Sequence, residues 1–163
     1  MDRRRIEAER TTEIVTLTEQ DLPALAGLYR QFGGERSALE DMRRVFHRLE
    51  NNPGYRLLGA KRGKQLVGTV MGVICEELYG RCRPFMVVED MIVDGAGRRQ
   101  GAGTLLMRAI EQEAVRRDCS YIMLVTDSFR TEALAFYRSL GYDPSRYRGL
   151  KKYLESPAGG PQA

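Results

Sequence analysis

The order of apolar and polar positions along the chain predicts alternating strands and helices. Short apolar runs typical of strands occupy residues 13–17, 55–61, 65–74, 84–93, 121–125 and about 147–154. Apolar residues at helical spacing follow Thr18, Ser37, the glycines at 101 and 103, and the capping pair Asp127-Ser128. The predicted order is therefore strand, two helices, three strands, helix, strand, helix and strand.

This order predicts a mixed α/β fold with a mainly antiparallel sheet. The turn Arg62-Gly63-Lys64 between two strand-like runs suits an antiparallel hairpin. A helix separates the strands at 84–93 and 121–125, so that pair should be parallel with a right-handed crossover.

The length of 163 residues suits one domain. We expect a flexible segment at 1–12, a single domain over 13–155, and a disordered tail at 156–163, where small residues and proline dominate. No apolar run approaches the roughly 18 to 20 residues that cross a bilayer, and no apolar segment of a signal peptide follows the basic start. The expectation is a cytoplasmic protein without a membrane partner.

Composition argues against several other classes of protein. Three cysteines without CxxC spacing and a single histidine predict neither a metal cofactor nor a disulfide. The net charge of +4 is spread along the chain, which fits an anionic ligand or a plain solvated surface equally well. The sequence shows no helix-turn-helix, zinc module or basic aromatic cluster, so nucleic acid is not an expected partner.

The segment Arg98-Arg99-Gln100-Gly101-Ala102-Gly103 lies between a predicted strand and a predicted helix. The first backbone N–H groups of a helix have no partner within it, and glycine lets an anion approach the backbone closely. The segment matches neither a Walker A loop nor the full dinucleotide fingerprint. Taken alone, it indicates an anion site or an ordinary structural turn.

Two ordered matches narrow the interpretation. Glu89-Asp90-Met91-Ile92-Val93-Asp94 followed by the segment at 98–103 closely resembles the cofactor motif Arg/Gln-x-x-Gly-x-Gly/Ala of the GNAT superfamily of N-acetyltransferases. Residues 133–142, with Phe136-Tyr137 and Gly141-Tyr142, resemble that family's closing helix. The resemblance implies a sheet with a central splayed parallel strand pair, flanked by about four helices.

The resemblance also implies a reaction and a cofactor site. Acetyl-CoA is the acyl donor, and a primary amine of a small molecule, peptide or protein attacks it directly in a ternary complex. The implied cofactor-binding residues are Met91, Ile92 and Val93 along the pantetheine arm, then Arg98, Arg99, Gln100, Gly101, Ala102, Gly103, Thr104 and Arg130. Arg130 stands where many members have an asparagine, and Gly95 replaces a common proline.

The resemblance places Tyr137 near the sulfur, where a phenol can return a proton to the CoA thiolate. The same position on an apolar helical stripe also fits a packed core tyrosine. For the base, alternation along a strand points Glu89 and Asp90 to opposite faces, and we prefer Glu89 acting through water. A carboxylate that holds an arginine, or a site without any dedicated base, fits equally.

The acceptor stays open among a small-molecule amine, an amino acid and a protein lysine. Catalytic residues favour an enzyme over a catalytically silent acyl-CoA sensor or interaction domain of the same fold, and a nucleic-acid or protein-binding domain ranks last. Dimers are common among similar proteins, which favours a homodimer.

Overall fold

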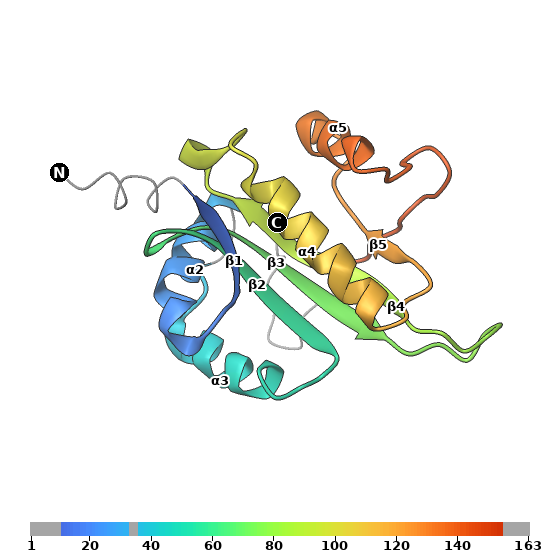
Figure 1. Cartoon of the computed structure of the whole chain (residues 1–163), viewed down its shortest axis with the longest axis horizontal. Helices are drawn as coiled ribbons and strands as arrows, with labels where there is room; N and C mark the ends of the chain where they lie inside the picture. The colour runs from blue at the N-terminus through green and yellow to red at the C-terminus, as the bar shows by residue number, and fades with distance from the viewer. Residues whose placement is uncertain (1–10, 33–35, 155–163) are drawn as a thin grey trace. The chain divides into compact units, whose positions relative to one another are not determined.

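The computed structural model describes residues 11–32 and 36–154 (Figure 1). The first ten residues of the expected flexible segment and all of the expected tail lie outside this part. The chain divides into two compact units, one up to Leu124 and one from Val125 onward. The single domain over 13–155 stays a prediction.

The first unit holds a five-stranded sheet in the order β1-β2-β3-β4-β5. Its elements are β1 (Thr12–Thr16), η1 (Glu19–Asp21), α2 (Leu22–Tyr29), η2 (Arg30–Phe32), α3 (Leu39–Leu49), β2 (Tyr55–Arg62), β3 (Gln65–Cys75), β4 (Phe85–Val93), η3 (Gly95–Gly97), α4 (Ala102–Arg116) and β5 (Ile122–Leu124). All neighbouring strands are antiparallel except β4 and β5, which are parallel. The predicted mixed α/β class and the predicted parallel pair are confirmed.

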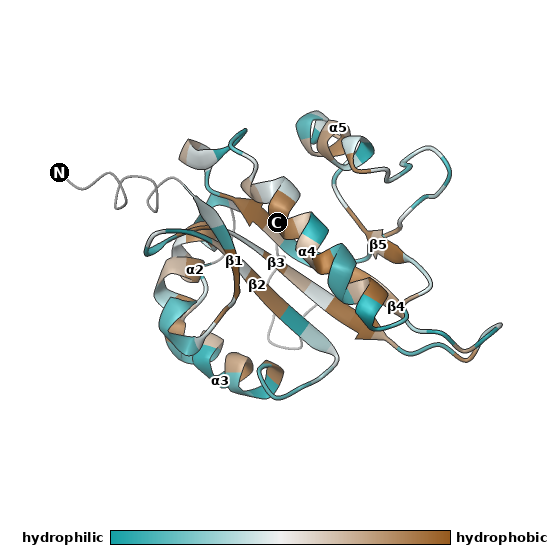
Figure 2. Ribbon diagram, in the orientation of Figure 1, coloured by the Kyte–Doolittle hydropathy of each residue, from teal (hydrophilic) through white to brown (hydrophobic). Residues whose placement is uncertain are grey.

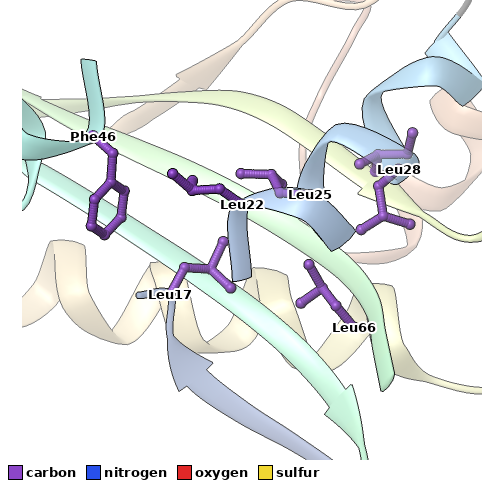
Figure 3. Packing of buried hydrophobic residues seen from close by; sticks show 7 residues of the cluster. Leu17, Leu22, Leu25, Leu28, Phe46 and Leu66 are labelled. Carbon is purple, nitrogen blue, oxygen red and sulfur yellow. The ribbon is translucent and has the colours of Figure 1, made fainter. Parts of the chain in front are cut away.

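One face of the sheet is covered by α2 and α3. Apolar side chains from both helices meet the strands in a buried cluster (Figure 3) made of Leu17, Leu22, Leu25, Leu28, Phe46, Leu66 and Ile92. The helical spacing of leucines at 22, 25 and 28 explains why α2 forms here, because it lines up one apolar face for burial. This packing fixes the end of α2 beside β4.

The other face is covered by α4, which buries Leu106, Met107 and Ile110 completely. Figure 2 shows the hydrophobic colouring concentrated along the central strands, whereas the turn before α4 is hydrophilic. A methyl group at Gly72 would lie 2.8 Å from the Cδ1 atom of Ile110, so this glycine permits the close approach of helix and sheet. Helix α4 thus packs directly against β3 and β4.

The second unit contains α5 (Thr131–Ser139), none of whose residues is fully buried. The helix begins after Arg130 without a side-chain cap, and the carbonyl of Asp127 instead accepts the N–H of Arg130 at 3.0 Å. The predicted cap at Asp127-Ser128 is therefore wrong. The strand predicted at about 147–154 is also wrong, since the described residues after α5 form no strand and their large apolar side chains are exposed.

Candidate functional site

The parallel ladder between β4 and β5 is short. Its pairs are Met86 with Ile122, Val87 with Met123, and Val88 with Leu124. Strand β5 ends at Leu124, while β4 continues to Val93. The backbone of residues 89–93 therefore runs past the end of its parallel neighbour, and this stretch includes the three residues predicted to line a pantetheine arm.

A β-bulge bends β4 where this ladder ends. Met71 pairs with Glu89 and Thr69 pairs with Ile92, so Val70 alone faces both Asp90 and Met91. Asp90 has a φ of 52°, a left-handed conformation that is uncommon outside glycine. Bulges increase twist and redirect side chains, and they occur often beside active sites.

The bulge breaks the alternation that the sequence predicted for Glu89 and Asp90. Val88 pairs with Gly72 on the side of α4, so Glu89 lies on the opposite side, which α2 covers. Asp90 also faces α2, because its Oδ2 atom accepts a hydrogen bond from the hydroxyl of Tyr29 at 3.3 Å. The expectation that the two carboxylates point to opposite faces is wrong.

The contact between Tyr29 and Asp90 changes the proton affinity of both groups. Burial and the nearby Asp90 charge raise the pKa of Tyr29 well above its ordinary value, so its hydroxyl stays protonated and donates. Burial likewise raises the pKa of Asp90, although the Tyr29 hydrogen bond lowers it in part. Asp90 nevertheless keeps a solvent-exposed surface.

The turn from β4 to α4 has the predicted strand-turn-helix form. Gly101 has a φ of 83° and caps the helix, which begins at Ala102. The N–H of Leu105 donates to the carbonyl of Gly101 at 3.0 Å, so the N–H groups of residues 102–104 precede the first bond of the helix. Arg98 and Arg99 are exposed just before this point. The arrangement presents positive charge and N–H donors together, which suits a phosphate.

Two distant side chains fix this turn, and sequence analysis identified neither. Arg62 donates from both Nη atoms to the side-chain oxygen and the carbonyl oxygen of Gln100, and from Nε to the Thr12 hydroxyl. Gln31 donates to Asp94 at 3.2 Å and accepts the N–H of Gly95 at 3.0 Å. No local pattern signals these contacts, because they join segments that only the folded sheet brings together.

The first unit thus brings Glu89, residues 91–93 and residues 98–104 onto one strand and the helix that follows it. The second unit holds the other two candidates. Arg130 occupies the cap position of α5, and Tyr137 is half-buried, with its ring centroid 5.2 Å from that of Phe136 and 6.0 Å from that of Tyr142. This aromatic packing accounts for the Phe-Tyr and Gly-Tyr residues that the sequence singled out.

Two groups of features are absent from residues 11–32 and 36–154, the part of the chain that the structure describes. No three His, Cys, Asp or Glu side chains gather there in a way that would hold a metal ion. No helix in the same part of the chain is long and apolar enough to cross a membrane.

Residues 11–142 match the family described as Acetyltransferase (GNAT) family. The chain belongs to the GNAT family. The match covers the sheet, the bulge, the turn at 98–103 and α5, so both ordered sequence matches fall within it. GNAT membership supports acetyl transfer as the general class of activity, and GNAT proteins typically take acetyl-CoA.

Similar proteins include one sequence relative and several solved structures with this fold. The Bacillus subtilis (strain 168) protein YdhI, described as uncharacterized, is 29% identical over 75 residues, which span 46% of this chain and 44% of YdhI. A transcriptional regulator from Bacillus halodurans C-125 has a TM-score of 0.80 at 27% identity, covering 88% of this chain and 100% of that one. Glucosamine-6-phosphate N-acetyltransferase from Arabidopsis thaliana has a TM-score of 0.80 at 18% identity, covering 89% and 99%. The last likeness shows the fold alone.

Proposed function

We propose that this chain transfers an acetyl group from acetyl-CoA to a primary amine of a small molecule or of a peptide or protein. The observation that carries the proposal is the bulged end of β4. This end extends beyond the last pair with β5, and the turn after it leads into the glycine-capped start of α4. Membership of the GNAT family supports the same reading.

The residues around this strand fit acetyl-CoA as a co-substrate. The backbone of Met91, Ile92 and Val93 offers hydrogen-bonding groups that β5 does not use, which suits the amides of a pantetheine arm. The segment from Arg98 to Thr104 offers N–H donors and two guanidinium groups to a pyrophosphate. Arg130 is proposed to reach a phosphate or an acidic group of the acceptor.

The chemistry needs a neutral amine, a polarised thioester and a proton for the leaving thiolate. Tyr137 is the proposed proton donor to the thiolate, and Glu89 is the base that the sequence predicts, acting through water. Holding the amine and the thioester together contributes rate independently of either group.

A second candidate function is an acyl-CoA sensor without catalysis. It is favoured by the likeness to a structure described as a transcriptional regulator, which has 27% identity over 88% of this chain. The two functions share a cofactor site and differ in whether the bound thioester is consumed.

A paired experiment tests the proposal. Thermal unfolding with and without CoA reports binding, and thiol release from acetyl-CoA reports transfer to 1,5-diaminopentane, glucosamine 6-phosphate, L-lysine and a lysine-containing peptide. We expect stabilisation by CoA together with thiol release for one of these amines. Stabilisation without release for any of them selects the sensor, and no stabilisation overturns the acyl-CoA site. Light scattering in the same buffer tests the expected homodimer.

A further inference from the structure

Three structural features of β4 meet at Asp90. It is the second residue beyond the last β4–β5 pair, it is the bulged residue opposite Val70, and its backbone has positive φ. A non-glycine residue keeps such a conformation only where the surrounding structure holds it there, and such residues cluster at functional sites. The bulge turns the carboxylate toward α2, immediately before the stretch proposed to line the pantetheine arm.

Tyr29 holds this carboxylate from the side of α2. It is the last residue of a helix whose leucines are buried in the core, and its hydroxyl lies 3.3 Å from the Oδ2 atom of Asp90. Two positions further on, Gln31 binds Asp94 and Gly95. The end of α2 and the following turn are thus fastened to β4 at both ends of the segment 90–94, which fixes the direction of the Tyr29 ring.

We propose that Asp90, rather than Glu89, accepts the proton of the amine during acyl transfer, and that Tyr29 is the positioning residue that orients it. This proposal rests on the proposed function. It adds one catalytic residue and one positioning residue that the sequence pattern did not identify.

Comparison with Glu89 supports the assignment. Both carboxylates lie on the side of the sheet that α2 covers and both keep exposed surface, but Glu89 makes no hydrogen bond or ion pair with another described residue. Asp90 has a fixed donor and a partly buried setting that raises its pKa toward the range in which a carboxylate works well as a base. Tyr29 from α2 donates a hydrogen bond to Asp90, and Glu89 is its titratable neighbour on the same strand.

The proposed step balances with the groups already named. The lone pair of the neutral amine attacks the thioester carbon, and a C–N bond forms while the C–S bond breaks. The surplus proton on nitrogen passes to Asp90, and the CoA thiolate is protonated by a general acid or by water. Asp90 then releases its proton to solvent, so the products are the amide and free CoA.

The test compares Asp90→Asn, Tyr29→Phe and Glu89→Gln with two control variants, Asp41→Asn on the exposed side of α3 and Tyr55→Phe on β2. Initial rates of thiol release are measured against pH with acetyl-CoA and the same four amines. Asp90→Asn should lower kcat about 100-fold, the ordinary scale of general-base catalysis, and should remove the acidic limb of the pH profile. CoA stabilisation should stay unchanged.

Tyr29→Phe gives the readout that separates positioning from folding. The Tyr29 hydrogen bond lowers the pKa of Asp90, so its loss raises that pKa and moves the acidic limb to higher pH. An acidic limb that stays in place in Tyr29→Phe, or a larger loss of kcat in Glu89→Gln than in Asp90→Asn, overturns the proposal and leaves the acyltransferase intact. Absence of thiol release by the wild-type protein overturns the enzyme itself, and the assignment of Asp90 falls with it.

Discussion

The guanidinium group of Arg62 donates hydrogen bonds to the side-chain oxygen and to the carbonyl oxygen of Gln100, although 38 positions separate the two residues. Arg62 also binds the hydroxyl of Thr12 at 3.0 Å, so it is itself anchored on β1. The carbonyl that it holds immediately precedes Gly101, where the chain turns into α4. A hairpin residue thereby sets the direction in which the turn proposed to bind phosphate presents its N–H groups.

Replacing this guanidinium group should lower the affinity for CoA more than it lowers the stability of the fold. Arg62→Met should raise the Kd for CoA about tenfold, or about 1.4 kcal/mol, because the turn keeps its glycines but loses the two hydrogen bonds that orient it. Isothermal titration with CoA measures the effect. Lys64→Met, on the exposed turn of the same hairpin, is the matched control and should leave the Kd within about twofold of wild type.

Gly101 offers a second test of the same turn. A side chain there would meet no atom within 4 Å, so the penalty for Gly101→Val comes from its φ of 83° and from the space that a phosphate needs. Gly101→Val should abolish stabilisation by CoA in thermal unfolding. Gly80→Val carries comparable strain at a φ of 62° with equally open surroundings, and it should keep the CoA response. Loss of the response in both variants would attribute the effect to strain alone.

A substitution at Tyr137 distinguishes an effect on turnover from an effect on CoA affinity. Tyr137→Phe keeps the ring that packs against Phe136 and Tyr142 and removes only the hydroxyl. We expect kcat to fall by about 100-fold in steady-state thiol release, in line with general-acid catalysis, while CoA affinity is unchanged. Tyr147→Phe, at an exposed position of the same unit, controls for loss of a phenol. Equal rates for Tyr137→Phe and wild type would contradict the role of proton donor.

Glu113 links the stability of the first unit to pH. Burial raises the pKa of this carboxyl, but hydrogen bonds from Arg116 and Arg56 outweigh burial and hold it below the ordinary value of 4.5. Because the pKa is lower in the folded state, the stabilisation is complete at a pH above the unfolded-state pKa. It is lost as the pH falls through the folded-state pKa. Urea unfolding should therefore show wild-type stability declining between about pH 5 and about pH 3.

Glu113→Gln should remove this component. It should lower the free energy of unfolding at neutral pH by about 3 kcal/mol, because Arg56 loses a partly buried partner, and it should flatten the acid dependence. Glu13→Gln, exposed on β1, is the control and should keep the wild-type slope. An unchanged slope in Glu113→Gln would assign the acid sensitivity to other carboxyls.

Local pattern was enough to predict most of the fold. Five of the six predicted strands formed within a few residues of their expected bounds, because their apolar runs are bounded by turn residues. The strand expected at about 147–154 did not form, since a run of suitable residues becomes a strand only when a neighbour pairs with its backbone. The helix before this segment, α5, does not use its predicted cap for a related reason, because Asp127 takes part in a turn instead.

The candidate site was predicted only where it is contiguous in sequence. The turn at 98–103 follows from its glycines and its place between strand and helix. The bulge at Asp90 does not, because strict alternation is the default interpretation of an apolar run and one extra residue reverses it. Tyr29 and Gln31 reach the site from α2 and η2, and Arg62 reaches it from β2. Such contacts depend on how the folded elements pack together rather than on sequence spacing.

The three-pair ladder between β4 and β5 also has a mechanical consequence. Few backbone bonds hold this seam, whereas β3 binds β4 over most of its length, so local opening should begin on the side of β5. In native-state hydrogen exchange, amides of β5 should exchange sooner than those in the middle of β3. The sheet can therefore loosen at its β5 edge while the strands β1 to β4 stay paired, so the edge beside residues 86–88 is its least stable part.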